Sequence, residues 1–164
     1  MSTRREGVEV LIALGANLGD RGATLDGAVA ALAAEPGLAV LGVSPWIETR
    51  SVGGPDAQPD YLNGAARLAC ELTARALLER LFAIERRFGR DRARELRRGP
   101  RPLDLDLLVY GDEEIDEPGL VVPHPRLEER VFVLAPLAHL VPDRRLPRSG
   151  LTVVERLAAL RAPA

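Results

Sequence analysis

Four runs of strand length recur in the first 110 residues, separated by two stretches of helical periodicity. The apolar runs at 8–14, 38–47 and 61–72 predict β-strands, the second of them interrupted by Pro45. The run at 103–110 alternates leucine with aspartate, which is typical of a strand with one polar face. Segments 50–59 and 89–101 lack apolar periodicity and are expected to be loops.

Asp20 and Thr73 each stand just before a helical stretch, and both are favoured N-cap residues. Pro36-Gly37 ends the first stretch and Gly89 the second. The expected apolar positions are Leu25, Ala28, Val29 and Leu32 in the first, and Leu77, Leu78, Leu81, Ile84 and Phe88 in the second. Segments 126–140 and 151–160 predict two further helices after a rigid turn at 123–125. The order βαββαβαα favours an α+β sandwich over a doubly wound sheet.

The arginine-rich segment from 86 to 101 is followed at once by an Asp-x-Asp pair. Its eight arginines are Arg86, Arg87, Arg90, Arg92, Arg94, Arg97, Arg98 and Arg101. Residues two apart on a strand share a face, so Asp104 and Asp106 are expected to lie side by side. Guanidinium groups suit a polyphosphate, and paired carboxylates suit the Mg²⁺ ions that accompany it. The segment therefore predicts a phosphoryl-transfer site.

Each of these motifs also has a plainer interpretation. The Asp pair could belong to an edge strand whose polar face is solvated. The glycine turn at 15–20 resembles a phosphate loop, yet it lacks the full spacing and could be an ordinary turn. Tyr61 and Asn63 could stack on and read a flat heterocycle, or lie unremarkably at a strand start. His124, between two prolines, could be a fixed charged donor to a phosphate or only a turn residue.

Composition excludes several classes of function. All 22 basic residues are arginine, which excludes a Walker A loop, a Schiff-base enzyme and a pyridoxal enzyme. The net charge of −2 argues against a nucleic-acid partner. The single Cys70, the absence of an apolar stretch of membrane-spanning length and the lack of a signal-peptide core predict a cytoplasmic protein that binds no membrane. The 164 residues are expected to form a single domain, 1–164.

Six segments in order resemble the 6-hydroxymethyl-7,8-dihydropterin pyrophosphokinases, a family of the folate pathway. They are LGANLGD, GGPDAQPDYLNGA, LLERLFAIERRFGR, RGPRPLDLDLLVYG, VPHPRLEERVFVLAPL and VPD. The resemblance covers about residues 8–143, with the helix near 151–160 beyond it. It implies a ferredoxin-like fold and the transfer of pyrophosphate from ATP to the pterin hydroxymethyl group, with release of AMP.

The resemblance also implies roles for individual residues. Asp104 and Asp106 match aspartates that hold two Mg²⁺ ions, and together with Arg90 and Arg92 they are the expected catalytic residues. The expected pterin contacts are Thr49, Val52, Tyr61, Asn63 and Phe132. The expected ATP contacts are Glu85, Arg90, Arg92, Arg98, Arg101, His124 and Arg130, although Arg98 stands where some members have tryptophan. The expected partners are ATP, the dihydropterin and other folate-pathway enzymes.

Two other classes of function compete with this interpretation. A basic loop on an α+β sandwich could bind RNA, although the low aromatic content and the Asp pair weigh against it. A regulatory ferredoxin-like domain could bind ATP with Mg²⁺ and release no AMP.

Overall fold

The computed structural model describes residues 7–50, 60–91 and 101–162. Its strands are β1 (Val8–Ala16), β2 (Leu38–Val43), β3 (Ile47–Thr49), β4 (Tyr61–Cys70), β5 (Asp104–Tyr110), β6 (Ile115–Glu117) and β7 (Leu120–Val122). Its α-helices are α1 (Arg21–Ala34), α2 (Ala74–Arg87), α3 (Val131–Ala138) and α4 (Val153–Arg161), and a 3₁₀ turn covers Leu127–Glu129. Within these ranges no helix is long and apolar enough to cross a membrane.

The main sheet is antiparallel, in the order β2-β4-β1-β5, and β3 also pairs with β4. The path β1-α1-β2-β4-α2-β5 places β4 between β1 and β2, which is the split arrangement of a ferredoxin-like fold. The predicted fold class is therefore confirmed. The two predicted N-caps are present as well, since the side chains of Asp20 and Thr73 accept backbone N–H groups of the first turns of α1 and α2.

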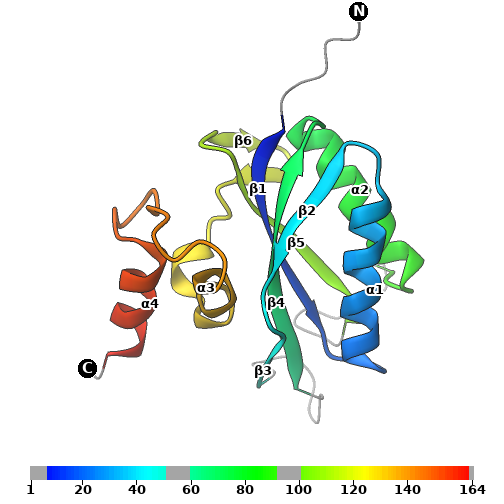
Figure 1. Cartoon of the computed structure of the whole chain (residues 1–164), viewed down its shortest axis with the longest axis horizontal. Coiled ribbons are helices and arrows are strands. Elements are labelled where there is room, and N and C mark those ends of the chain that lie inside the picture. The colour runs from blue at the N-terminus through cyan, green and yellow to red at the C-terminus, as the bar shows by residue number, and fades with distance from the viewer. Residues whose placement is uncertain (1–6, 51–59, 92–100, 163–164) are drawn as a thin grey trace, which may run out of the picture.

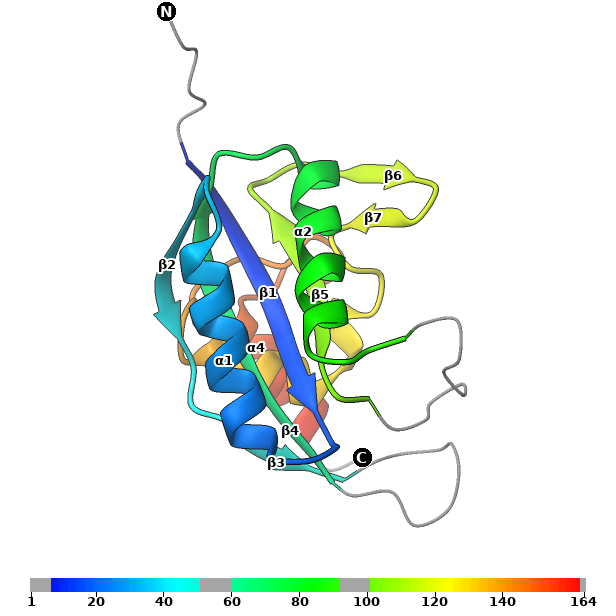
Figure 2. The same ribbon diagram turned by 90° about the vertical axis from the view of Figure 1, so that its right-hand side faces the viewer.

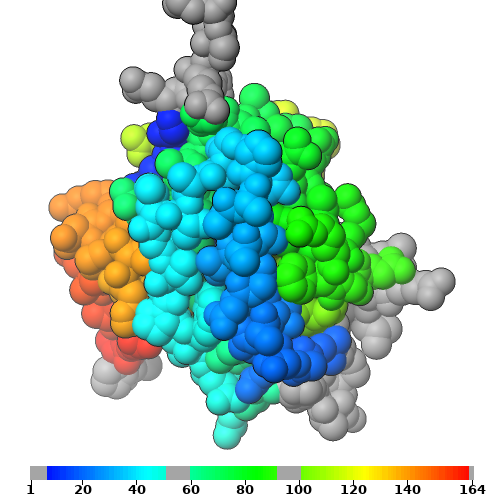
Figure 3. All heavy atoms as spheres, turned by 45° about the vertical axis from the view of Figure 1, so that its right-hand side comes forward, coloured from blue at the N-terminus to red at the C-terminus, as the bar shows by residue number. Residues whose placement is uncertain are grey.

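Helices cover both faces of this sheet (Figure 1). Because side chains alternate along β1, Val10 and Ile12 pack toward α1 and α2, while Leu11 packs toward α3 and α4. Figure 2 shows α1 and α2 side by side across the first face. In the space-filling view α1 lies between β2 and α2 (Figure 3).

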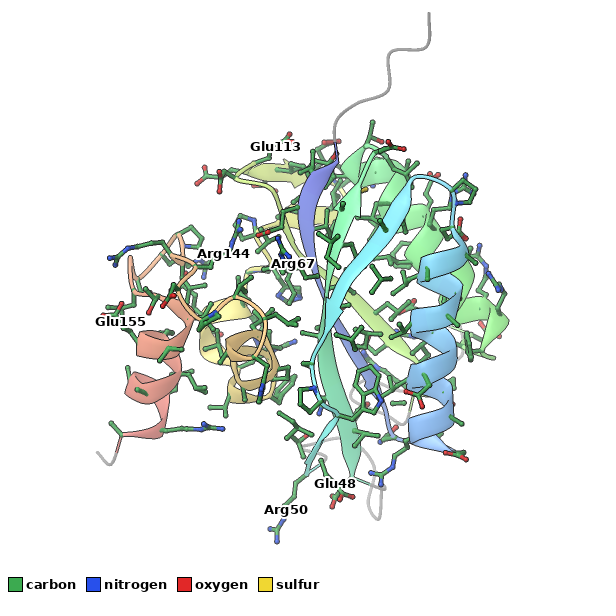
Figure 4. The ribbon with its side chains drawn as sticks, in the orientation of Figure 1. Glu48, Arg50, Arg67, Glu113, Arg144 and Glu155 are labelled. Atoms are coloured by element: carbon green, nitrogen blue, oxygen red, sulfur yellow. The ribbon has the colours of Figure 1, made fainter. Side chains whose placement is uncertain are left out.

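An ion-pair network joins the segment between α3 and α4 to the sheet. Glu9 on β1 accepts hydrogen bonds from Arg67 Nε and Arg144 Nη1, each at 2.8 Å. Arg144 also donates to the carbonyl oxygen of Gly111 at 2.6 Å. In Figure 4 Arg67 and Arg144 approach each other between the sheet and this segment. The helical layer of α3 and α4 is thus tied to the sheet by charge as well as by apolar packing.

In the last third of the chain one prediction is wrong and one hairpin was not predicted. The helix expected over 126–140 is a 3₁₀ turn followed by α3, because Arg130 between them is extended (φ −115°, ψ 107°). The β6–β7 hairpin was not predicted, since each strand has only three residues and two of the three in β6 are Asp and Glu. Its turn is Pro118-Gly119, a dipeptide typical of turns and the one signal of the hairpin in the sequence, and Gly119 there has a positive φ of 74°.

Gly64 on β4 is required by a close approach of Trp46. A Cβ atom at residue 64 would lie 2.3 Å from the indole ring. We expect Gly64→Ala to lower the free energy of unfolding by about 1–3 kcal/mol through overpacking. Gly22→Ala is the matched control, because a Cβ there meets only Asp20 Oδ1 at 4.0 Å. Urea unfolding should find the control unchanged or slightly more stable, and equal stability of the two variants would contradict the packing argument.

Candidate active site

Strand β5 presents Asp104 and Asp106 on one face, as the spacing predicted. Both carboxylates are partly buried, and they line one small recess together with Asn63 and Phe132. The alternative of an edge strand with a solvated polar face is correct in one respect, because β5 is the last strand in the sheet order. Its polar face is not simply solvated, however, because Asp104 Oδ1 accepts a hydrogen bond at 2.8 Å from the buried Arg90.

A buried ion pair supports the two aspartates from below. Glu85 and Arg90 are 1% and 4% exposed, and Arg90 Nη1 donates to Glu85 Oε2 at 2.7 Å. The same Glu85 oxygen accepts the backbone N–H of Leu105, the residue between the aspartates, at 2.8 Å. Glu85 therefore fixes both the β5 backbone and the guanidinium that holds Asp104. Both residues were expected to contact ATP, and the structure gives them this supporting position beneath Asp104.

The second carboxylate is held in an environment that disfavours its charge. Burial, together with the neighbouring charges of Asp104 and Glu85, raises the pKa of Asp106 to about 7. The charges of Arg130 and Arg90 oppose this effect in part. A site that keeps two carboxylates together at this electrostatic cost is suited to a cation.

A cleft of about 450 Å³ opens beside the aspartates. It is lined by Thr49, Arg50, Tyr61, Asn63, Arg101, Asp104, Arg126, Glu129, Arg130, Val131 and Phe132. The cleft therefore joins the ends of β3 and β4 to the start of α3, across the end of β5. Four arginines reach it, and Arg101 Nη1 lies 3.6 Å from Asp104 Oδ2. In Figure 4 Arg50 projects from the chain just beyond β3.

One part of the cleft combines aromatic rings with a side-chain amide. Tyr61 comes from β4, whereas Phe132 comes from α3 and is 42% exposed. The Arg130 guanidinium lies 5.5 Å from the centroid of the Phe132 ring. Asn63 is buried and its Nδ2 donates to Thr49 Oγ1, which fixes the orientation of the amide. This arrangement suits a flat ligand with a hydrogen-bonding edge.

His124 lies near this site but does not line the cleft. It borders a second hollow of about 430 Å³, between β7 and residues 147–148. Burial and the charge of Arg130 lower the pKa of His124, so the imidazole is neutral at neutral pH. Its Nδ1 accepts the Arg126 N–H at 3.1 Å, which leaves the proton on Nε2. The expected donor is available, but it is not the charged donor that the sequence suggested.

The structure brings most of the predicted residues together. Thr49, Tyr61, Asn63, Phe132, Arg101, Arg130 and Asp104 line the cleft, Asp106 lines the adjoining recess, and Glu85 and Arg90 lie beneath them. Val52, Arg92 and Arg98 lie outside the described residues. Sequence analysis missed Arg126 and Glu129, and it noted Arg50 only as part of a loop. Arg50 follows β3, and Arg126 and Glu129 belong to the region of the 3₁₀ turn. These two regions come together only in the folded protein, so sequence spacing could not indicate that they share a cleft.

Among residues 7–50, 60–91 and 101–162, no three His, Cys, Asp or Glu side chains form a metal-binding group. In these ranges the candidate metal ligands are the two carboxylates of Asp104 and Asp106 on β5. Mg²⁺ is commonly bound in this way, by one or two carboxylates, with water and substrate phosphates completing the coordination. The donor set fits Mg²⁺ accompanying a polyphosphate better than a metal enclosed by protein ligands.

The raised pKa of Asp106 has a consequence for stability. Between its ordinary value of 3.8 and about 7, the folded protein holds a proton that the unfolded chain releases, so stability falls as pH rises through this range. Asp106→Asn removes the cost of ionising this buried carboxyl group. Without divalent metal, we expect its free energy of unfolding to exceed that of the wild type by roughly 1–3 kcal/mol at pH 8. This advantage should shrink toward pH 4. Denaturant unfolding at several pH values measures it, with the exposed Asp143→Asn as control. An advantage independent of pH would contradict the assignment.

Comparison with known proteins identifies the family. The model of the 7,8-dihydro-6-hydroxymethylpterin-pyrophosphokinase (HPPK) family matches residues 11–142. The chain is 44% identical to the 2-amino-4-hydroxy-6-hydroxymethyldihydropteridine pyrophosphokinase of Synechocystis sp. over 145 residues, covering 88% of this chain and 72% of that protein. It is also 44% identical to the protein of the same name from Methylorubrum extorquens over 149 residues, 91% of each chain.

A solved structure agrees in fold. The wild-type HPPK-DHPS of Plasmodium falciparum matches with a TM-score of 0.69 at 12% identity, covering 96% of this chain. This chain spans 45% of the length of that protein, and at such low identity the likeness shows the fold alone. The family match and the sequence relatives confirm the resemblance, and the chain belongs to the 7,8-dihydro-6-hydroxymethylpterin-pyrophosphokinase family.

Proposed function

We propose that the cleft beside Asp104 and Asp106 carries out the reaction of the family in folate biosynthesis. In this reaction the hydroxymethyl oxygen of 6-hydroxymethyl-7,8-dihydropterin attacks the β-phosphorus of ATP. The bond from the β-phosphorus to the α,β-bridging oxygen breaks, AMP leaves with that oxygen, the hydroxyl proton is released and the pterin carries the diphosphate. The observation that carries the proposal is the Asp104–Asp106 pair at the edge of a cleft with arginines and aromatic rings. We treat residues 1–164 as one catalytic domain, because both helical layers pack on the same sheet.

The pterin would occupy the aromatic part of the cleft. Phe132 and Tyr61 offer ring surfaces, and Asn63 and Thr49 form a fixed polar edge. A bicyclic heterocycle is bound well by such stacking together with side-chain amide contacts. The exposure of Phe132 supports this role, because ligand binding would bury a ring that the protein leaves open. Val52 is a further proposed pterin contact, on the resemblance alone.

The triphosphate would lie along the arginine-rich part of the cleft, beside the two aspartates. Burial and the charge of Arg126 lower the pKa of Arg130, so this part of the cleft gathers positive charge that an anion would relieve. Arg101 and Arg130 can make bidentate contacts with phosphate oxygens as charge grows on the leaving AMP. Arg92, Arg98 and the Nε2–H of His124 are further proposed ATP contacts.

Asp104 and Asp106 would hold Mg²⁺, and two ions are expected. When bound, Mg²⁺ neutralises phosphate charge and helps to align the attacking hydroxyl group. The contribution of the chain is to keep both carboxylates on one face of β5, at one recess, in spite of their repulsion. Glu85 and Arg90 do so from below, through Leu105 N–H and Asp104 Oδ1.

Two further expectations remain part of this proposal. A folate-pathway enzyme is a proposed partner, supported by the folate synthesis bifunctional protein of Arabidopsis thaliana, which is 44% identical to this chain over 133 residues that make up 27% of its own length. A cytoplasmic setting is proposed because Cys70 is buried and unpaired.

Product analysis tests the function directly. The wild-type protein with ATP, Mg²⁺ and 6-hydroxymethyl-7,8-dihydropterin should give pterin-dependent AMP. Asp106→Ala should lose on the order of 1,000-fold in rate with its fold retained, whereas Asp143→Asn should stay active. ADP as product would contradict pyrophosphate transfer. Tight binding of ATP without AMP formation would favour the regulatory domain, and retention of RNA on a filter at moderate salt would favour the RNA-binding module.

The pterin assignment has a test of its own. Phe132→Ala is expected to weaken dihydropterin binding about 10- to 100-fold, because a stacking surface is lost. Its thermal stability should change little, since the ring is 42% exposed. Val154→Ala on α4 is the control, an equally exposed apolar side chain outside the cleft. Isothermal titration with the dihydropterin measures the effect, and unchanged affinity would remove Phe132 from the site.

A further inference from the structure

The glycine turn at 15–20 has a role that the phosphate-loop interpretation did not include. Gly15 and Ala16 form the last residues of β1, and Asp20 already caps α1 by accepting the N–H of Ala23 at 3.1 Å. Asn17 lies between these two elements and is completely buried. A buried amide at this point calls for hydrogen-bond partners.

Asn17 is hydrogen-bonded to the backbone of Arg101. Asn17 Oδ1 accepts the N–H of Arg101 at 2.8 Å, and Asn17 N–H donates to the carbonyl oxygen of Arg101 at 3.2 Å. These two bonds connect residues 84 positions apart in the sequence. They fix the backbone of Arg101 from both its donor and its acceptor side.

The strand pairing explains why a side chain is needed here. β1 pairs with β5 through Ala13 with Asp106 and Gly15 with Asp104. Continued in the same register, this pairing would bring Asn17 opposite Pro102, which has no N–H to donate. The Asn17 amide reaches past the proline and takes the N–H of Arg101 instead. In this way the end of β1 holds the residue that directly precedes the proline.

Arg101 is a residue whose position matters to the proposed chemistry. Its Nη1 lies 3.6 Å from Asp104 Oδ2, and the residue lines the cleft. The Asn17 contact therefore fixes the backbone from which the Arg101 side chain extends toward Asp104, one of the two proposed metal ligands. A small displacement of such a group lowers the rate steeply, because phosphoryl transfer depends on positioning.

We propose that Asn17 is a positioning residue that holds Arg101 in place for pyrophosphate transfer. This inference rests on the proposed function and adds to it a residue that touches neither substrate. It predicts that loss of the Asn17 side chain lowers kcat and leaves substrate binding nearly unchanged. It also predicts that this loss in kcat depends on the presence of the Arg101 side chain.

The test compares two variants. The serine side chain in Asn17→Ser is too short to reach Arg101 N–H, whereas Asn17→Asp keeps an acceptor oxygen at the same distance from the backbone. We expect Asn17→Ser to lower kcat about 10- to 100-fold, with KM for the dihydropterin within about 3-fold of wild type. Asn17→Asp should stay closer to wild type. Thr73→Ala is the stability control, because it removes one side-chain cap at the far end of α2. A kcat loss in Thr73→Ala equal to that in Asn17→Ser would overturn the proposal.

A double variant separates positioning from general loss of structure. In an Arg101→Ala background, Asn17→Ser should lower kcat by no more than about 3-fold, since the group that it positions is gone. Multiplication of the two single effects would overturn the inference. Amide hydrogen exchange in the wild-type protein is a further readout, independent of any variant. The Arg101 N–H should be protected, and fast exchange would refute the contact. AMP formation by the wild-type protein is measured in the same experiment. If the wild type forms no AMP, the proposed function fails, whereas an unaffected Asn17→Ser variant overturns only this inference.

Discussion

The repulsion between Asp104 and Asp106 is the constraint on which the site depends. Two carboxylates on one strand face are costly to hold together, and burial together with the charge of Asp104 raises the pKa of Asp106. Arg90 offsets part of this cost and pairs with Asp104. Glu85 adds a negative charge of its own, but it holds Arg90 and the β5 backbone in place. Removing one member would leave an uncompensated buried charge. The pair therefore belongs to the structure of the site, whether or not its members also meet a substrate.

The ferredoxin-like sheet explains why one small domain can assemble this site. The carboxylates come from β5, the supporting Glu85 from the end of α2, and the amide of Asn63 from β4. Phe132 and Arg130 come from the opposite helical layer, which the Glu9–Arg67–Arg144 network ties to the sheet. The cleft thus lies between one end of the sheet and the start of α3, and its walls come from different elements. A ligand that fills it would contact residues far apart in the chain.

Local rules in the sequence predicted the parts of the site that depend on short spacing. The two-residue interval placed both aspartates on one face, and the caps Asp20 and Thr73 marked both helices correctly. The rules failed where tertiary contacts decide. Nothing in the spacing of Glu85 and Arg90 indicates that both are buried beneath β5, and the Asn17–Arg101 contact exists only because β1 pairs with β5. The extended Arg130 broke a helix that the apolar pattern predicted. The substrates came from resemblance, since charge and periodicity alone left RNA binding and nucleotide binding open.

The most direct measurement locates the metal. Crystals grown with Mn²⁺ in place of Mg²⁺, a non-hydrolysable ATP analogue and the dihydropterin would give anomalous density at the ion positions. If the aspartate pair is the metal site, the strongest peaks lie within about 2.0–2.4 Å of carboxylate oxygens of Asp104 and Asp106, with phosphate oxygens as the other ligands. Peaks bound only to the nucleotide, with the Asp104 carboxylate still paired with Arg90 and Arg101, would contradict the metal assignment and leave the aspartates a structural role.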